Sequence, residues 1–335
     1  MADDWTAPGT FEVAPGVYRI PLPLPNDGLR AVNVYAVQVQ DGFVVVDAGW
    51  SIPSAKDLLA AAMDSLGAGL GDIRRFLVTH AHRDHYSQAI VLRREFGTPV
   101  SLGLGEKPTL DVLQEQDRAP LRHQVAHLRL LGAPQIADAV EAWGQKPSDE
   151  DTFWESPDDW LTDGPLALDG GRVLEVVETP GHTRGHVVFH DTAAALLFAG
   201  DHVLPTITPS IGFESAVSPD PLGAFLRSLE RVRSRPDALL LPAHGAVAPS
   251  VHARVDELVA HHGQRLDQAE AIATGGKTAF ETAGILTWTR HERTLDELDV
   301  FNKMLAISET GAHLDLLVAQ GRLSCAEIDG VRQYR

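Results

Sequence analysis

The sequence predicts an α+β protein made of two halves in which strands and helices alternate, followed by a small C-terminal module. Apolar, β-branched runs of strand length recur in both halves, and helical patterns separate many of them. Residues 107–163 interrupt this alternation, and after about residue 264 the pattern changes to helices and a hairpin signal. We therefore expect residues 1–263 to form one large domain and residues 264–335 a second, smaller one.

In the first half, each expected strand is a short apolar run, and each helix has one apolar face or a terminating glycine. The expected strands are 16–25, 31–39, 41–50, 73–80 and 99–103, and the expected helices are 54–69 and 87–97. The second half has the same style without a detectable sequence repeat. Its expected strands are 172–182, 193–202 and 237–245, and its expected helices are 219–235 and 250–276.

The segment 107–163 reads as a mostly helical insertion that ends in an acidic and aromatic stretch. We expect it over one end of the sheets, either as an extra helical pair or as a substrate lid. It carries four large aromatic residues that could wall an apolar pocket or serve as packing: Trp143, Phe153, Trp154 and Trp160.

The C-terminal module begins with two capping-box patterns, Thr278 with Glu281 and Thr294 with Glu297. A helical pattern over 295–321 and an Asp-Gly hairpin signal follow. Three helices and a two-stranded hairpin are typical of a winged helix. Acidic residues outnumber basic ones in this module, which favours packing or dimerisation over nucleic-acid binding.

The composition excludes several classes of protein. The chain of 335 residues carries a formal charge of -18, which disfavours a general nucleic-acid binder. Its single cysteine, Cys325, cannot form an intrachain disulfide and lies far from the motifs. We find no signal-peptide pattern and no apolar run of membrane-spanning length, and expect a soluble cytoplasmic protein.

The segment "HAHRDH" places His80, His82, Asp84 and His85 where a strand should give way to a helix. His80 and His82 would point to one side if extended. Imidazole and carboxylate groups without thiolates bind Zn, Fe, Mn or Ni. The alternative, a hydrophilic loop, leaves three histidines in six residues unexplained. The segment therefore predicts metal ligands.

Three further candidates also follow expected strands: His182, Asp201 and His244. Sites in α/β folds lie at the carboxyl ends of strands, so we expect all these residues to meet. Five histidines and two aspartates suffice for two metal ions that share a carboxylate. Two such ions can hold a hydroxide between them and polarise a substrate oxygen, so no serine or cysteine nucleophile is required.

Over about residues 12–250, the chain resembles the metallo-β-lactamase-fold hydrolases. The resemblance rests on five pieces that occur in this order: "VVVDAG", "THAHRDH", "TPGHTRGH", "AGDH" and "PAHG". The resemblance implies a four-layer αββα sandwich with the metals at one edge of the two sheets. It implies that Asp47 supports the ligands without binding metal, although on the sequence alone Asp47 could equally be a turn residue before Gly49. It also implies that His186 and His202 are structural or support the ligands rather than bind metal. The implied ligands are His80, His82 and His182 for the first ion, Asp84, His85 and His244 for the second, and Asp201 as the bridge.

The ligand set is most similar to that of the glyoxalase II and nuclease-like branch, so β-lactam hydrolysis is disfavoured. Residues 250–335 resemble the winged-helix extension of lactamase-β-like hydrolases, a subgroup with endoribonucleases and polyketide-associated thioesterases. Two glycines usually follow the histidine motif, whereas Ser87 and Gln88 stand here. We expect Tyr86 and Ser87, beside the metals, to set this protein's specificity.

We expect a hydrolase that binds two divalent ions, with Zn²⁺ as the first candidate and Fe or Mn as alternatives. Its expected substrate is a small thioester, lactone or ester. The expected nucleophile is a hydroxide between the two ions, which Asp84 orients. One alternative is a metal-dependent phosphodiesterase or endoribonuclease, which a winged helix would favour and the acidic charge opposes. A remote alternative is an iron-dependent oxygenase on the same fold. Expected partners are a small-molecule substrate and, for the C-terminal module, a second copy of the chain.

Overall fold

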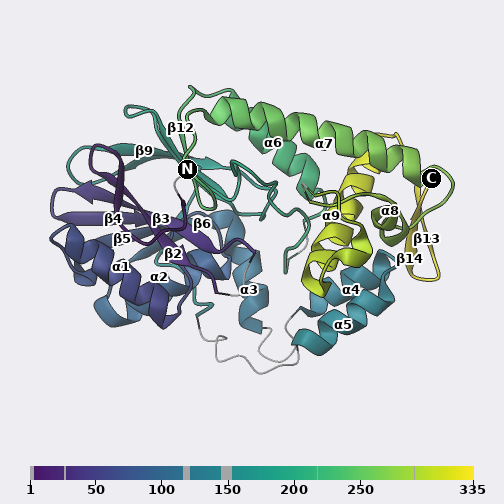
Figure 1. Ribbon diagram of the computed structural model, residues 1–335, viewed down its shortest axis with the longest axis horizontal. Coiled ribbons are helices and arrows are strands. Elements are labelled where there is room, and N and C mark those ends of the chain that lie inside the picture. The colour runs from purple at the N-terminus through teal and green to yellow at the C-terminus, as the bar shows by residue number, and fades with distance from the viewer. Residues whose placement is uncertain (1–3, 26–27, 116–120, 145–152, 217, 290) are drawn as a thin grey trace.

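The computed structural model describes residues 4–25, 28–115, 121–144, 153–216, 218–289 and 291–335. Within these ranges the strands form three sheets, and helices cover the two larger ones on their outer sides (Figure 1). Part of the insertion, including the acidic residues 147–152, and Arg290 of the C-terminal module lie outside the described ranges.

The first sheet has its strands in chain order, antiparallel up to β4 and parallel from β4 onward. The change of direction follows from the helices, because parallel neighbours need a crossover and helices α1 and α2 supply two. The strands are β1 (Phe11–Ala14), β2 (Val17–Pro23), β3 (Ala31–Val39), β4 (Gly42–Val46), β5 (Ile73–Val78), β6 (Val100–Gly103) and β7 (Asp159–Leu161).

The second sheet has the order β12-β11-β10-β9-β8, in which only the pair β11–β12 is parallel. Helix α6 makes that crossover. The strands are β8 (Gly164–Ala167), β9 (Val173–Glu178), β10 (Val187–Asp191), β11 (Leu196–Gly200) and β12 (Leu239–Pro242). The sequence analysis did not predict β1, β7, β8 or β10, which are short and, except for β10, not fully buried.

The alternation of side chains along β3 shows how the layers are assembled. Tyr35 and Val37 pack against the second sheet, where the rings of Tyr35 and Phe198 lie 5.5 Å apart. Val34 and Ala36 point to the opposite side, into the core beneath α1 (Pro53–Ser65) and α2 (Arg83–Phe96). The outer face of the second sheet packs against α6 (Pro221–Arg233) and α7 (Val251–Ala273). The expected αββα sandwich is confirmed.

The remaining helices and the third sheet form a second body, which we call the C-terminal lobe (Figure 1). It contains α4 (Arg122–Leu130), α5 (Pro134–Gly144), α8 (Ala279–Ile285), α9 (Val300–Ala319), β13 (Cys325–Ile328) and β14 (Val331–Tyr334). The helix α3 (Lys107–Glu115) stays with the sandwich, where Leu110 joins the core beside α2.

The position of the insertion differs from the expectation. Its helices α4 and α5 do not lie over one end of the sheets but pack on the C-terminal lobe. Leu131 accepts a hydrogen bond from the amide of Phe280, and its side chain fits against Gly311 of α9. Their apolar faces are buried there because α9 presents a small residue that lets the helices approach closely.

Helix α7 connects the two bodies. The expected domain boundary at 263/264 lies inside this uninterrupted helix, and one apolar core runs from the second sheet into the C-terminal lobe. Both capping boxes form at Thr278 and Thr294, and a bridge between Lys277 and Tyr334 joins the hairpin to the segment before α8. The description of this lobe as a winged helix stays a prediction.

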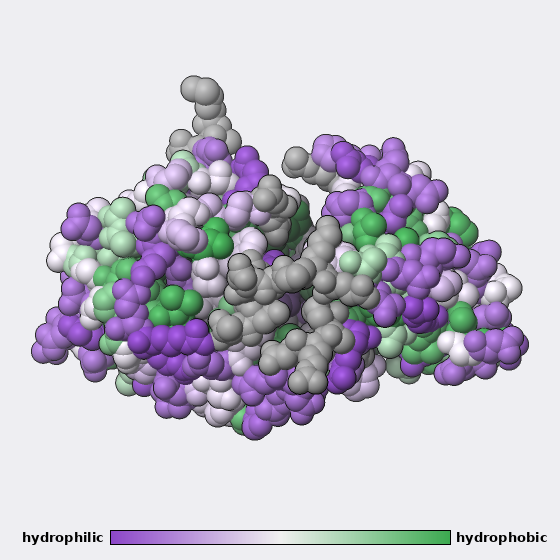
Figure 2. All heavy atoms as spheres, turned by 90° about the horizontal axis from the view of Figure 1, so that it is seen from below, coloured by the Kyte–Doolittle hydropathy of each residue, from purple (hydrophilic) through white to green (hydrophobic). Residues whose placement is uncertain are grey.

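Hydrophilic side chains predominate on the face shown in Figure 2, and apolar ones gather in small patches. Among the described residues, no helix combines the length and apolarity that crossing a membrane requires.

Candidate metal centre

The loop after β5 and the first turn of α2 carry four of the predicted ligands. His80 follows the end of β5, and His82 is the N-cap residue of α2, with extended backbone angles. Asp84 and His85 stand in the first turn of that helix. A carboxylate in the first turn is stabilised by the helix dipole. The strand-to-helix transition expected from the sequence is therefore present, and it directs four side chains into one space.

The other three predicted ligands follow strands of the second sheet. Asp201 comes directly after β11, His244 follows β12, and His182 follows β9. These three strands run in the same direction, so their carboxyl ends lie at one edge of the sandwich. The two sheets thus bring distant segments to a single site.

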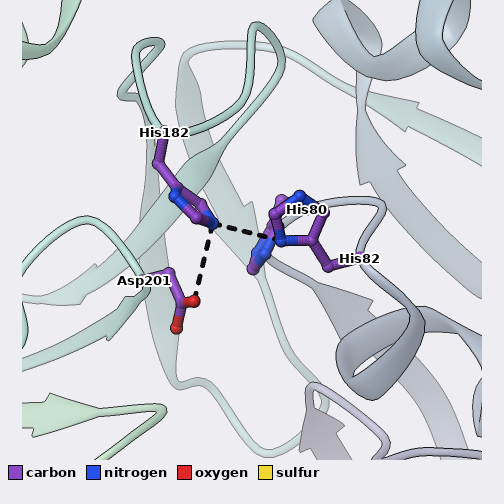
Figure 3. Close-up of side chains that lie close together, drawn as sticks. All are labelled: His80, His82, His182 and Asp201. Atoms are coloured by element: carbon purple, nitrogen blue, oxygen red, sulfur yellow. Dashed lines mark hydrogen bonds and ion pairs between the residues drawn. The ribbon is translucent and has the colours of Figure 1, made fainter. Parts of the chain in front are cut away.

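The seven residues lie in two adjoining groups. One ligand atom each from His80, His82, His182 and Asp201 lie within 4.8 Å of one another, and Asp84, His85 and His244 form a second such group. Figure 3 shows His182 pointing towards both His82 and Asp201. His182 Nε2 lies 3.2 Å from His82 Nδ1. Two nitrogens bound tetrahedrally at about 2.0 Å from one zinc ion would be about 3.3 Å apart.

Asp201 faces both groups with different oxygens. Its Oδ2 lies 3.5 Å from His182 Nε2 in the first group. Its Oδ1 lies 3.3 Å from His244 Nε2 and 3.7 Å from His85 Nε2 in the second group. One carboxylate with an oxygen for each group has the position that a bridging ligand requires.

Four of the five candidate histidines have a partner at Nδ1, which leaves Nε2 facing the centre, whereas His82 faces His182 through Nδ1. His182 Nδ1 donates to the carbonyl of Ser210 and His244 Nδ1 to that of Ala31, each at 2.8 Å. Among the described residues, the buried Nε2 atoms of His80, His85 and His244 have no hydrogen-bond partner. Buried nitrogens without partners are costly unless they bind an ion. The donor set therefore fits divalent metal.

Asp47 lies directly behind the second group and binds His85 through Oδ2, 3.0 Å from Nδ1. Its Oδ1 accepts hydrogen bonds from the amide and hydroxyl of Thr79, at 2.9 and 3.0 Å. Its backbone is left-handed, with φ of 59°, a costly conformation that persists where the surroundings enforce it. Asp47 contacts a candidate ligand without belonging to either group.

The electrostatic states of the two groups differ. Burial lowers the pKa of His80 well below its usual value and that of His82 to about 3, and neighbouring histidines add to the effect. Burial has the same influence on His85, but the carboxylates of Asp84, Asp47 and Asp201 outweigh it and raise the pKa of His85 to about 10. Asp201 and Asp84 likewise outweigh burial at His244 and raise its pKa.

His186 lies behind a candidate ligand, which is the kind of structural or supporting role that the family resemblance implied. Its Nε2 accepts a hydrogen bond of 3.2 Å from the amide of Asp201, and its Nδ1 lies 2.8 Å from the hydroxyl of Thr179. Its ring stacks on that of His80, with centroids 5.0 Å apart. His186 therefore fixes the backbone of the bridging residue. The only sequence signal was its place in "TPGHTRGH".

Two glycines allow the segments of the centre to approach each other. Gly200 precedes Asp201 with φ of 49°, and a Cβ there would lie 2.7 Å from both His186 Nε2 and Thr79 Oγ1. A Cβ at Gly185 would lie 1.9 Å from the amide nitrogen of Glu106. Glu106 is fully buried and accepts a hydrogen bond from the Thr183 hydroxyl, which joins the loop after β6 to the loop of His182.

The expectation that Tyr86 and Ser87 set specificity is wrong, because both are fully buried. The hydroxyl of Tyr86 donates to the carbonyl of Glu155 at 2.7 Å, on the helix side of the first sheet. Ser87 donates to the carbonyl of Arg83 and accepts from the amide of Ser51. The reason is helical geometry, which turns the residues after His85 inward.

Three of the aromatic residues in the insertion are packing residues. Phe153 is buried in the core beneath α2, and Trp154 and Trp160 pack against the same core. Trp143 lies elsewhere, on the C-terminal lobe. The sole cysteine, Cys325, is exposed on β13, away from the centre.

The comparisons with known proteins agree with this site. The family model of the metallo-β-lactamase superfamily matches residues 27–244. The chain is 25% identical over 311 residues to the probable metallo-hydrolase YqjP of Bacillus subtilis, covering 90% of this chain and 91% of that protein. It is 23% identical to an atrochrysone carboxyl ACP thioesterase of Aspergillus novofumigatus, covering 78% of this chain and 64% of that one.

Solved structures show the same relationship. A metallo-β-lactamase family protein from Thermus thermophilus is 27% identical, with a TM-score of 0.77 over 96% of this chain and 99% of that chain. A β-lactamase domain protein from Burkholderia ambifaria is 28% identical, with a TM-score of 0.78 over 99% and 97%. With the family model spanning most of the sandwich, the chain belongs to the metallo-β-lactamase superfamily and is a hydrolase.

Proposed function

We propose that this hydrolase binds two divalent ions and cleaves an acyl thioester, lactone or ester. The observation that carries the proposal is Asp201, whose two oxygens face two separate ligand groups. The first ion would be held by His80, His82 and His182, the second by Asp84, His85 and His244, and Asp201 would bridge them.

The chemistry of the donors favours zinc, with iron or manganese as alternatives. The two groups offer imidazole and carboxylate and no thiolate. When bound, two such metal ions supply a Lewis acid for the substrate oxygen and lower the pKa of a bound water to about 7. Because the ligands arise from four rigid strand ends, the chain holds them in place before substrate binds.

Asp84 is the residue that we propose orients the attacking water. Its side chain is 21% exposed, whereas those of His85 and His244 are almost completely buried. Its Oδ2 lies 3.4 Å from His244 Nε2. Although burial opposes ionisation, His85 and His244 hold the pKa of Asp84 below its usual range, so it remains an acceptor for a water proton.

The acyl class is supported by the relatives. A protein named as an acyl-carrier thioesterase aligns with 78% of this chain. In contrast, the solved subclass B3 metallo-β-lactamase of Bradyrhizobium japonicum is 18% identical with a TM-score of 0.55, a likeness in fold alone. The chain has a formal charge of -18, which would repel the negatively charged phosphates of a phosphodiester or RNA and so disfavours those substrates.

A substrate panel tests the proposal. The metal-reconstituted protein is assayed with thioesters, lactones, carboxylic esters, phosphodiesters and RNA, and Asp201→Ala serves as the inactive control. We expect hydrolysis of at least one acyl class that Asp201→Ala abolishes. Hydrolysis of RNA or phosphodiesters without any acyl hydrolysis would replace the proposed reaction.

A further inference from the structure

We propose that the acyl group of the substrate lies along a row of aromatic side chains that begins at His82 and consists of Phe213, Phe301 and Trp143. We call these three residues the aromatic track. The substrate would then carry an extended apolar or aromatic acyl group rather than a small polar one. This inference rests on the proposed acyl hydrolysis and narrows its substrate class.

The ring positions define the track. The ring of Phe213 lies 6.5 Å from that of the candidate ligand His82. Phe301 follows at 5.6 Å from Phe213, and Trp143 at 5.9 Å from Phe301. Within the track, the interplanar angles are 82° and 68°, so the rings meet edge to face. In each such contact the edge of one ring covers part of a face of its neighbour, and the surface of Phe301 and Trp143 that stays exposed can pack against an apolar chain.

The track joins three segments that are distant in sequence. Trp143 is near the end of α5, Phe301 lies in the first turn of α9, and Phe213 belongs to the loop between β11 and α6. Helix α5 comes from the insertion, so the insertion supplies the outer end of the track. The proposed substrate would therefore contact the sandwich and the C-terminal lobe together.

The loop that carries Phe213 is held at several points. The carbonyl of Ser210 accepts a hydrogen bond from His182, one of the candidate ligands. Arg254 of α7 donates to the carbonyls of Leu204 at 2.6 Å and Ile207 at 2.9 Å. Gly212 lies against the carbonyl of Ser308 in α9. These contacts fix Phe213 between the metal centre and the C-terminal lobe.

Exposure increases from the centre outward along the track. Phe213 is half-buried, whereas Phe301 is 38% exposed and Trp143 is 47% exposed. Val300, next to Phe301 in the sequence, is also exposed, at 39%. Contiguous exposed apolar groups mark binding surfaces. The inner end of this surface is a candidate metal ligand, so its position favours a substrate group over a second copy of the chain.

The first test measures kcat/KM for acyl thioesters with one leaving group and chains from acetyl to dodecanoyl. We expect the wild type to prefer the long chains. In Phe301→Ala and Trp143→Ala, kcat/KM should fall roughly tenfold for the dodecanoyl thioester and little for the acetyl thioester, because each substitution removes apolar contact only with the long chain. Phe301→Leu should retain part of the preference.

Phe96→Ala is the matched control, because Phe96 is 43% exposed at the end of α2 and lies outside the track. It should keep the wild-type dependence on chain length. If kcat/KM depended on acyl-chain length in the same way in the wild type, Phe301→Ala and Trp143→Ala, the proposed role of the aromatic track would be overturned. A shift from dimer to monomer in Trp143→Ala, measured by sedimentation, with the chain-length profile retained, would overturn it as well.

A binding measurement separates this inference from the reaction. Calorimetry with a non-hydrolysable dodecyl thioether should give at least roughly tenfold weaker binding to Phe301→Ala than to wild type or Phe96→Ala. If no acyl compound is hydrolysed but the thioether binds in this pattern, the proposed reaction fails and the track stands. If acyl compounds are hydrolysed but all three proteins bind the thioether equally, the track fails and the reaction stands.

Discussion

The two ligand groups of the centre differ in charge although they share Asp201. In the group of His80, His82 and His182, imidazoles are each other's neighbours, and burial keeps them neutral. In the group of His85 and His244, carboxylates surround the imidazoles and favour their protonated forms. If each group binds an ion, we expect the first to do so from neutral imidazoles, whereas binding in the second would compete with protons.

This difference indicates that one fold edge can hold two sites of unequal affinity. The cause is the distribution of three carboxylates. Asp47 and Asp84 lie next to His85, and Asp201 lies between the groups. A divalent ion in the second group would replace the protons as the partner of these carboxylates.

The largest effect is expected for Asp201→Ala, because it removes the residue that both groups share. We expect hydrolysis to fall to background and the bound metal to fall below the two equivalents that we expect for the wild type. Elemental analysis and the substrate panel measure both. A variant with two tightly bound equivalents would remove Asp201 from the bridging position.

A pair of single substitutions should separate the groups. His82→Ala should weaken binding of the first ion and leave the second ligand group intact. His85→Ala should weaken binding of the second ion and leave the first group intact. Each variant should therefore retain about one equivalent of metal per chain. Both should lose activity with little loss of fold. His123→Ala, on α4 outside the centre, is the matched control and should keep both ions. Two equivalents in either ligand variant would contradict the assignment.

Asp47→Asn should have an intermediate effect confined to one group. It removes the charge that faces His85 Nδ1, and loss of such a supporting partner costs roughly 10–100-fold in metal affinity. The second ion should dissociate at lower chelator concentration, with the first unchanged. Asp57→Asn on the exposed side of α1 is the control. An equal loss of affinity for both ions would show that Asp47 acts on the whole centre and not on the second group alone.

The smallest effect is expected from a change of one pH unit, which should alter the affinity for the second ion by up to about tenfold for each proton released. His85 has a pKa raised to about 10, so below that value it must lose a proton to bind metal. Affinity for the second ion should therefore rise up to about tenfold per pH unit and per proton released between about pH 6 and pH 9. His82, with a pKa lowered to about 3, stays neutral in that range. Metal titration by calorimetry should show one pH-dependent and one nearly pH-independent step.

Much of the centre was predictable because its densest part is local. Four candidate ligands stand within six residues, and the strand-to-helix transition alone directs them into one space. His182, Asp201 and His244 were predicted because each follows an apolar strand. The resemblance implied a structural or supporting role for His186, but its partner was not predictable, because its bond to the amide of Asp201 depends on the packing of two loops.

The errors have a common origin in long-range packing. Tyr86 and Ser87 are adjacent to the ligands in sequence, yet helical rotation buries them. The insertion was expected over the sheets, but α5 packs on α9 and brings Trp143 beside Phe301. The boundary at 263/264 falls within α7 because that helix supplies apolar residues to the sandwich and to the C-terminal lobe.

The sequence by itself determined the residue types of the candidate centre and their places after strands, because strand periodicity and imidazole chemistry are local properties. The tertiary structure decides which oxygen of Asp201 faces which group, which histidines have a raised or a lowered pKa, and which aromatic residues approach His82. Those depend on distances between segments far apart in the chain, and the packing of two sheets and a C-terminal lobe sets them.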